Sequence, residues 1–181
     1  LWMSVLVDVD TGRFALPLVV GTCVAAAVDE VAPSVRGSVK WPNDVVVRTR
    51  KLAGILVERR AAGTVVGIGV NLETPEVDAG GALPPIGLVE AAGRPLSSTV
   101  ASELCGAILR SLRAALDADG SAEAARSAFQ ERDALLDAPI ESEIHGRGVA
   151  RGVDAEGALW LERPDGTRVR VVSGSVRLVA P

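Results

Sequence analysis

The chain has 181 residues, of which 48% are hydrophobic and 23% charged, a composition that indicates a globular protein and excludes a disordered one. Its formal net charge of −4 excludes a broad basic surface of the kind that binds nucleic acid or anionic lipid. The longest apolar stretch stops at Asp29 and Glu30, short of the length that a membrane-spanning helix needs.

The first part of the chain predicts a strand, a helix and then an antiparallel meander. Apolar and polar residues alternate over residues 4–9, and turn residues follow, which is typical of a strand. Apolar residues recur at three- and four-residue steps over residues 16–31, with Pro17 in the first turn and Pro33 just past the end, so a helix is expected there. Three apolar runs separated by short charged or glycine-containing connections predict consecutive hairpins: residues 38–41 with 45–47, 52–58 and 64–70.

The middle of the chain predicts a loop and two helices. Residues 73–95 are rich in Gly and Pro and are expected to be mostly loop, with one short helix inside it. Next, an amphipathic helix is predicted from residue 99 to residue 120, with apolar residues on one face. Ser121 can cap a second helix that runs to about Leu136 and turns Phe129 and Leu136 inward.

The periodicity changes to two after Pro139, which predicts a run of short strands: residues 140–149, 150–153, 158–162, 167–172 and 175–179. Good turn sequences join several of them. A small β-barrel is the expected result. The chain is therefore predicted to be α+β and to divide into a first domain over residues 1–136 and a second over residues 137–181.

The segment KWPND, which begins at Lys40, places a cation, a large aromatic ring, a proline, an amide and a carboxylate side by side in apolar surroundings. Because Pro42 lacks an N–H, the strand is expected to be interrupted or bulged here, which lets polar side chains face a ligand. Lys40 suits a phosphate or carboxylate, Asn43 a base edge or ribose, and Asp44 a metal or hydroxyl. The structural alternative is a turn in which Asp44 pairs with Lys40 and Trp41 fills the core.

Two further segments on the following strands carry similar features. In KLAGILVE, Lys51 is a lone cation at the start of a strand, and Gly54 weakens the strand unless a ligand or another backbone approaches closely. In GIGVN, Gly67 and Gly69 occupy alternate positions and leave one face of the strand flat, and the amide of Asn71 follows. Three neighbouring hairpin strands with such features predict one shared cleft.

In this order and at this spacing, KWPND, KLAGILVE and GIGVN closely resemble the motifs of the biotin protein ligases, also called holocarboxylase synthetases. The resemblance covers the whole chain. It implies a class II synthetase-like catalytic domain with a mixed or antiparallel sheet and helices, followed by a small SH3-like β-barrel. Members of the family make biotinyl-5′-AMP from biotin and ATP with Mg²⁺. They then pass the biotinyl group to a lysine of a carboxyl-carrier protein, such as that of acetyl-CoA carboxylase.

The resemblance also implies roles for individual residues. Lys51 is the implied catalytic cation, in contact with the biotin carboxylate or the acyl-phosphate oxygen, and Gly54 leaves room for the ligand. The other implied residues fall into three groups: Lys40, Asn43 and Asp44 for the ATP phosphates, the adenylate and the metal; Gly67, Gly69 and Asn71 for biotin and the adenylate; and Asn71 with Arg177 for ATP.

Compared with the family, the chain is expected to be a fragment that begins just after the Gly-Arg-Gly-Arg-type loop that closes over biotin. Two hypotheses of different class follow. The first is a working ligase whose upstream part is encoded elsewhere. The second is a non-catalytic truncated remnant that can dimerise or contact a carrier domain without holding biotin. A lipoate ligase is a third alternative, which the pair KWPND and KLAGI disfavours. The 181-residue chain alone is expected to label a carrier domain poorly or not at all.

The remaining expectations concern location, assembly and isolated residues. Cys23 and Cys105 lack metal-ligand spacing and suit the core of a cytoplasmic protein, and no secretion signal is evident. The winged-helix DNA-binding domain of some relatives is expected to be missing, and a homodimer through sheet edges is one expectation. His145 is expected in a turn as a solvated or structural residue, and Trp160 in the packing of the small barrel. Trp2 is interpreted as a core residue, with stacking on a ligand as the alternative.

Overall fold

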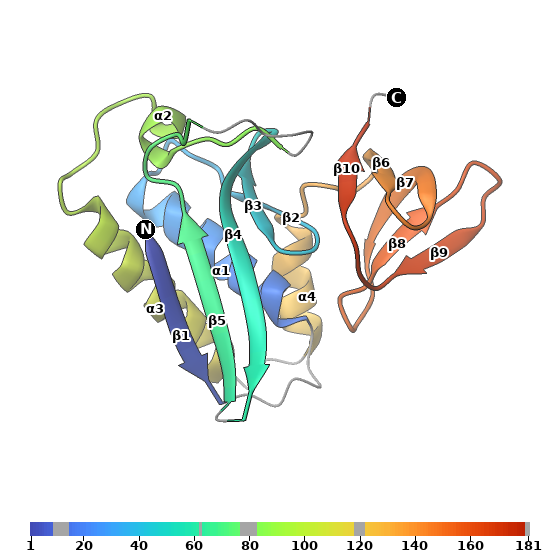
Figure 1. Ribbon diagram of the computed structural model, residues 1–181, viewed down its shortest axis with the longest axis horizontal. Helices are drawn as coiled ribbons and strands as arrows, with labels where there is room; N and C mark the ends of the chain where they lie inside the picture. Colours follow the sequence, from blue (N-terminus) through green and yellow to red (C-terminus); the bar gives the residue numbers. More distant parts are fainter. Residues whose placement is uncertain (9–14, 62, 77–82, 118–121, 180–181) are drawn as a thin grey trace.

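The computed structural model describes residues 1–8, 15–61, 63–76, 83–117 and 122–179. Its elements in chain order are β1 (Trp2–Val7), α1 (Leu16–Val31), β2 (Ser38–Lys40), β3 (Asp44–Val47), β4 (Arg50–Arg60), β5 (Gly63–Val70), α2 (Leu88–Ala92), α3 (Val100–Asp117), α4 (Ala122–Gln130), β6 (Pro139–Ser142), β7 (Gly146–Val153), β8 (Leu159–Glu162), β9 (Arg168–Val171) and β10 (Val176–Leu178). The strands form two five-stranded sheets (Figure 1). We call them the N-terminal sheet, with the order β1-β5-β4-β3-β2, and the C-terminal sheet, with the order β10-β6-β7-β8-β9.

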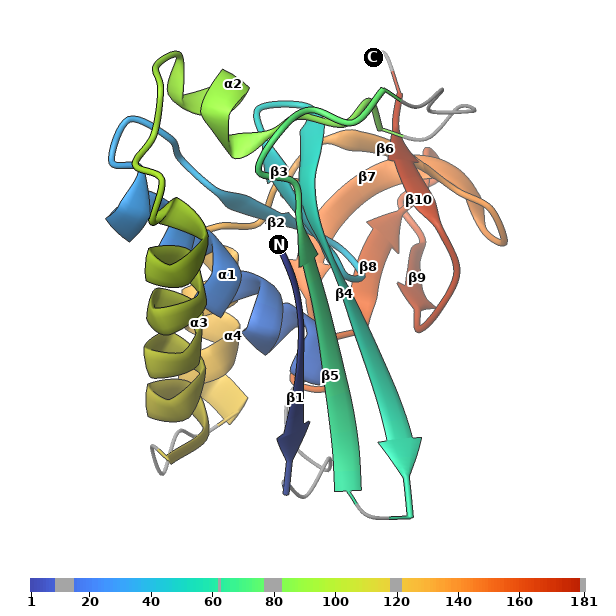
Figure 2. The same ribbon diagram turned by 60° about the vertical axis from the view of Figure 1, so that its left-hand side comes forward.

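The N-terminal sheet is the predicted antiparallel meander, and β1 is added at the free side of β5. Helices α1, α3 and α4 cover one of its faces (Figure 2). Burial alternates residue by residue along β5, with Val66, Ile68 and Val70 buried and the residues between them half-exposed. The opposite face of this sheet therefore stays accessible, because a strand sends successive side chains to opposite faces.

The helices follow the predicted periodicities with one exception. Along α1, Leu18, Val24 and Val28 are buried, and the apolar face of α3 is buried as predicted. The second helix was expected to reach Leu136, but α4 ends at Gln130, and it is Leu135 that is buried while Leu136 is 47% exposed. The predicted helix end at Gly120 and the cap at Ser121 lie outside the described residues.

Tertiary pairing explains why the helical pattern stops. The segment after α4 pairs with β2, since the Val39 N–H donates to the Arg132 carbonyl at 2.7 Å and the Ala134 N–H donates to the Val39 carbonyl at 2.9 Å. The isolated bridge between Val39 and Asp133 is parallel. An extended partner replaces the last turns of the expected helix and shifts the buried position by one residue.

The C-terminal sheet corrects two predicted strands. The run over residues 140–149 is divided between β6 and β7 by a turn at residues 143–145, and the strand predicted over residues 150–153 is the second half of β7. Ser142 Oγ accepts a hydrogen bond of 3.3 Å from the His145 N–H, and Gly146 has φ of +76°, a conformation that favours glycine. His145 thus lies in a turn as expected, and Trp160 is half-buried on β8.

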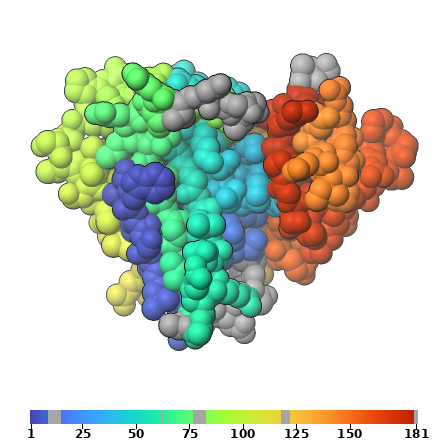
Figure 3. All heavy atoms as spheres, in the orientation of Figure 1, coloured from blue at the N-terminus to red at the C-terminus, as the bar shows by residue number. Residues whose placement is uncertain are grey.

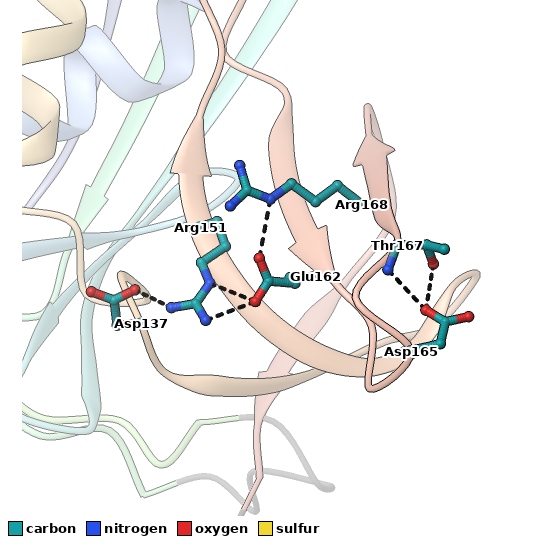
Figure 4. A network of polar contacts seen from close by, with 6 residues as sticks. All are labelled: Asp137, Arg151, Glu162, Asp165, Thr167 and Arg168. Atoms are coloured by element: carbon teal, nitrogen blue, oxygen red, sulfur yellow. Dashed lines mark hydrogen bonds and ion pairs between the residues drawn. The ribbon is translucent and has the colours of Figure 1, made fainter.

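A network of exposed and half-exposed charges ties the connecting segment to the C-terminal sheet (Figure 4). Arg151 on β7 contacts Asp137 at 2.6 Å and Glu162 on β8 at 2.8 Å. Arg168 on β9 contacts the other carboxylate oxygen of Glu162 at 3.1 Å. Three adjacent strands and the end of the connection are therefore linked by ion pairs.

The α+β class and the small SH3-like sheet are thus as expected. Within the described ranges, no helix is both long and apolar enough to span a bilayer.

Candidate functional site

The three sequence motifs lie side by side on the accessible face of the N-terminal sheet. The register places Asp44 of β3 opposite Gly54 of β4, Gly54 opposite Gly69 of β5, and Gly69 opposite Trp2 of β1. Directly paired residues in a sheet point to the same face. One row across four strands therefore carries a carboxylate, two glycines and an indole.

Lys51 and Asp44 form the charged centre of this row. Lys51 Nζ lies 2.5 Å from Asp44 Oδ1, and the two side chains are 40% and 16% exposed. Asp44 Oδ1 is buried, and no well-aligned hydrogen bond to it is recorded among the described residues, so the ion pair is its main contact. The Lys51 ammonium spans Gly54, where an added Cβ would lie 3.4 Å from Nζ. Gly54 thus leaves the space in which Lys51 reaches Asp44.

KWPND is a turn between two strands, as an interrupted strand predicts. β2 ends at Lys40, residues 41–43 form the turn with a cis Trp41–Pro42 peptide bond, and β3 begins at Asp44. The structural alternative is right that Trp41 is buried, at 3% exposure. Its expected ion pair is wrong, because Asp44 pairs with Lys51 and not with Lys40.

Lys40 is a buried cation. It is 6% exposed, and its ammonium donates a hydrogen bond of 3.4 Å to the Trp41 carbonyl. Burial lowers the pKa of Lys40 below its ordinary value, the nearby Asp44 carboxylate opposes this shift, and the positive charge of Lys51 adds to it. A buried ammonium with one weak acceptor is costly unless an anion completes its surroundings. The two lysines of the chain, Lys40 and Lys51, are both in this site.

The two asparagines of the motifs hold backbone groups beside the lysines. Asn43 Nδ2 donates to the Ile55 carbonyl at 2.8 Å, and Asn71 Nδ2 donates to the Lys51 carbonyl at 3.3 Å. Each contact joins a motif to the neighbouring strand β4. Among the described residues neither side-chain oxygen has a recorded donor, so both can accept hydrogen bonds from a ligand.

Arg177 is not brought to this cluster. It lies on β10 and contacts Glu141 of β6 at 2.7 Å within the C-terminal sheet. This ion pair holds down the pKa of the Glu141 carboxyl.

The expected metal site reduces to one carboxylate. No set of three or more His, Cys, Asp or Glu side chains suited to a metal occurs in the part of the chain that the structure describes. Among the described residues, Asp44 is the acidic residue that contacts the cluster, and its buried Oδ1 lacks a well-aligned donor. This donor set fits Mg²⁺ only when phosphate oxygens supply further ligands, which is how Mg²⁺ often binds in nucleotide sites.

Two residues of the site were placed wrongly or missed. The core position favoured for Trp2 is wrong, because Trp2 is 90% exposed and its ring covers Gly69, where a Cβ would lie 2.9 Å from the ring. The alternative, stacking on a ligand, stays a prediction. The alternation of β1 could have put Trp2 and Ser4 on the accessible face. A polar contact of Trp41 with the C-terminal sheet was not expected: its Nε1–H donates to the Gly157 carbonyl at 3.0 Å. No local sequence signal connects residues 116 positions apart.

Comparisons with known proteins agree with the motifs. The model of the biotin/lipoate A/B protein ligase family matches residues 1–74, and that of the biotin protein ligase C-terminal domain matches residues 141–179. A biotin–[acetyl-CoA-carboxylase] ligase of Paracoccus denitrificans is 36% identical over 149 residues, which cover 76% of this chain and 61% of that protein. The bifunctional ligase/repressor BirA of Escherichia coli K12 is 34% identical over 175 residues, which cover 90% of this chain and 52% of that protein.

Solved structures show the same fold. A biotin protein ligase from Aquifex aeolicus matches with a TM-score of 0.81 at 23% identity, covering 98% of this chain and 82% of that one. The same enzyme in complex with biotin and ATP matches with a TM-score of 0.79 at 24% identity, covering 98% and 78%. The chain spans about half to three-fifths of the length of the two curated relatives. From its two matched models, its relatives and its fold, the chain belongs to the biotin protein ligase family.

Proposed function

We propose that the protein is a biotin protein ligase, which makes biotinyl-5′-AMP from biotin and ATP and transfers the biotinyl group to a lysine of a carboxyl-carrier protein. The observation that carries the proposal is the pairing of Lys51 with Asp44 across Gly54 on an accessible sheet face. The names of the curated relatives and the complex of a similar fold with biotin and ATP support it.

The first step brings two anions together. An oxygen of the biotin carboxylate attacks the α-phosphorus of ATP, the P–O bond to the β-phosphate breaks, and pyrophosphate leaves. The attack gathers negative charge, which fixed cations stabilise best in a site that excludes water. Lys51, 40% exposed on the accessible face, can exchange Asp44 for the carboxylate or the phosphate. The buried ammonium of Lys40 lies beside Asp44, where a phosphate would complete its surroundings.

The second step needs no covalent enzyme intermediate. The amine of the carrier lysine attacks the acyl carbon of biotinyl-5′-AMP, an amide forms, AMP leaves and the amine loses a proton. We assign the side-chain oxygens of Asn43 and Asn71 to the adenylate, and the flat backbone at Gly67 and Gly69 to biotin and the adenylate. Mg²⁺ brought by the phosphates would add charge stabilisation, with Asp44 as its protein ligand.

The proposal extends to organisation and partners. We assign residues 1–136 to a partial catalytic domain and residues 137–181 to the SH3-like domain, which the separate sheets and the separate matched models support. The partner is a biotin carboxyl-carrier domain. A cytoplasmic location fits the two free cysteines, and pairing of two copies through sheet edges is proposed for the assembly. A reach of Arg177 toward ATP remains part of the proposal, and would require it to leave Glu141.

Two measurements test the function. The first is binding of biotinyl-5′-AMP to the purified chain by calorimetry, in parallel with the Lys51→Ala variant and with Arg113→Ala, which removes an exposed arginine of α3. We expect binding that Lys51→Ala weakens and Arg113→Ala leaves unchanged. The second is the mass of a carrier domain after incubation with biotin, ATP and Mg²⁺.

The outcomes separate the hypotheses. A mass increase at the carrier lysine that needs both biotin and ATP establishes the ligase. Adenylate binding without labelling supports the proposed ligand site and shows that this chain alone does not complete the transfer. Absence of both binding and labelling refutes the proposed site and favours the non-catalytic remnant.

A further inference from the structure

A loop of the C-terminal sheet contacts the KWPND turn. Residues 154–158 join β7 to β8, and the Gly157 carbonyl accepts the hydrogen bond from Trp41 Nε1–H at 3.0 Å. Trp41 is 3% exposed, so this contact is shielded from water. The space-filling view shows atoms of the C-terminal sheet packed against those of the N-terminal sheet (Figure 3).

The loop holds its carbonyl in a fixed place. Asp154 Oδ1 accepts hydrogen bonds from the Glu156 and Ala158 N–H groups at 3.0 and 2.9 Å, and its other oxygen contacts Arg170. Gly157 has φ of +84°, and an added Cβ would lie 2.5 Å from Ala15 Cβ, just before α1. Only glycine fits this left-handed conformation and this close approach. The acceptor that meets Trp41 is therefore built into the loop.

The residue just before KWPND, Val39, is held by the segment that connects α4 to the C-terminal sheet. Val39 of β2 exchanges backbone hydrogen bonds with Arg132 and Ala134, as described above. Lys40 follows Val39, and its ammonium donates to the Trp41 carbonyl. Lys40 thus lies between Val39 and Trp41, and both of these residues are hydrogen-bonded to residues that follow α4. The position of Lys40 depends on those residues and on the N-terminal sheet together.

We propose that Trp41 is a positioning residue through which the C-terminal sheet holds Lys40 and the KWPND turn in the geometry that binds the ATP phosphates. The inference rests on the proposed function. Without the indole N–H, the turn keeps its apolar packing but loses its link to Gly157. Other arrangements of the turn then become populated, and the apparent association constant for ATP equals the intrinsic one multiplied by the fraction of molecules that remain competent.

The first test is the affinity for ATP of the Trp41→Phe variant, which removes the donor and keeps an aromatic ring. We expect the dissociation constant for ATP to rise about tenfold, the loss expected when one buried hydrogen bond is removed and its carbonyl is left unpaired. Trp160→Phe is the matched control, since Trp160 lies on β8 of the C-terminal sheet, where it pairs with Arg170 of β9. We expect this control to bind ATP like the unaltered chain.

The second test uses the fact that Lys40 and Lys51 are the two lysines of the chain. A lysine-acylating reagent with peptide mass spectrometry reports the modification of Lys40 relative to Lys51, which serves as the internal reference. Lys40 is buried, so the unaltered chain should protect it. We expect Trp41→Phe to raise the Lys40 to Lys51 ratio several-fold and Trp160→Phe to leave it unchanged.

A third variant covers the case in which Trp41→Phe does not fold. Asp154→Ala loosens the loop that holds Gly157 without altering the N-terminal sheet, and should shift both readouts in the same direction.

The results divide as follows. Weaker ATP binding together with greater Lys40 modification supports the positioning role. Unchanged ATP affinity in a folded Trp41→Phe or Asp154→Ala variant overturns it, as does a protected Lys40. If the unaltered chain does not bind ATP, the proposed function fails, and the acylation ratio still decides whether Trp41 holds Lys40.

Discussion

The charged residues of the two sheets are arranged in opposite ways. In the C-terminal sheet, Arg151, Glu162 and Arg168 are at least partly exposed and pair with one another across three strands (Figure 4). At the KWPND end of the N-terminal sheet, Lys40 is buried with one weak acceptor. Lys51 shares a single carboxylate with it. Oppositely charged neighbours are therefore plentiful in one region and scarce in the other.

The difference indicates where ligand binding is expected. Exposed ion pairs satisfy each other and contribute little to stability, because water solvates their ends almost as well. A buried cation with an incomplete set of acceptors costs stability, and an arriving anion recovers that cost. The N-terminal cluster can therefore gain from binding a phosphate or carboxylate, whereas the charges of the C-terminal network already neutralise one another.

The largest expected effect is at Lys51. If the cluster stabilises the charge that develops during adenylate formation, Lys51→Ala should lower the rate by about 10² to 10³, as found when one such donor is removed. Biotin-dependent release of pyrophosphate from ATP measures this rate, with Arg113→Ala as the control. A variant that keeps more than about one tenth of the rate would contradict the role of Lys51. No release by the unaltered chain would favour the remnant hypothesis.

The next effect concerns Asp133, a half-buried acid in the segment that pairs with Val39 of β2. Burial raises its pKa from 3.8 to about 6, and the hydrogen bonds from the Leu135 and Leu136 N–H groups partly oppose this shift. Its Oδ2 is buried and accepts no hydrogen bond from the residues that the structure describes. The folded state therefore holds a proton that the unfolded state has released between about pH 4 and pH 6. Stability falls as pH rises through this window, by up to about 3 kcal/mol.

Asp133→Asn should remove that dependence and increase stability at pH 7. Urea unfolding at pH 4, 5, 6 and 7 measures the free energy of unfolding, and Asp117→Asn at the exposed end of α3 is the control. Parallel pH profiles for Asp133→Asn and the unaltered chain would show that Asp133 does not carry the effect.

The smallest effect is expected in the C-terminal network. Arg168 is 61% exposed and pairs with a Glu162 that also contacts Arg151. Arg168→Ala should lower the free energy of unfolding by less than about 1 kcal/mol, and high salt should reduce the difference further. Thermal unfolding at low and high ionic strength checks this. A loss above about 2 kcal/mol would mean that the ion pairs of the C-terminal sheet contribute strongly to stability, which would contradict the difference between the two sheets.

Much of the fold follows from local patterns in the sequence. The helix α1, the antiparallel meander and the apolar face of α3 were predicted, because burial of one face imposes a period of two on strands and of 3.6 on helices. The same alternation placed Gly67 and Gly69 on the accessible face. Motif spacing predicted that Lys51, Gly54 and Asp44 lie together, since hairpins bring neighbouring strands into register.

The failures have a common cause in long-range contacts. The helix expected to reach Leu136 ends early because the following residues pair with Val39, about ninety positions earlier. The structural alternative paired Asp44 with Lys40, its direct neighbour across the turn, but Asp44 pairs with Lys51, whose side chain extends over Gly54. Trp2 has a large apolar side chain of the kind that cores contain. It is 90% exposed because the helices pack on the opposite face of the sheet (Figure 2).

By itself, the sequence determined the residue types of the site, their order on adjacent strands and the family to which they belong, because those depend on side-chain chemistry and on spacing along one chain. The tertiary structure decided which charges pair, which lysine is buried, and that Gly157 of the second sheet meets Trp41 of the turn. The Lys51–Asp44 pair depends on side-chain reach between two strands of one sheet, and the Gly157–Trp41 contact depends on how the two sheets pack against each other. No local period or propensity encodes either one.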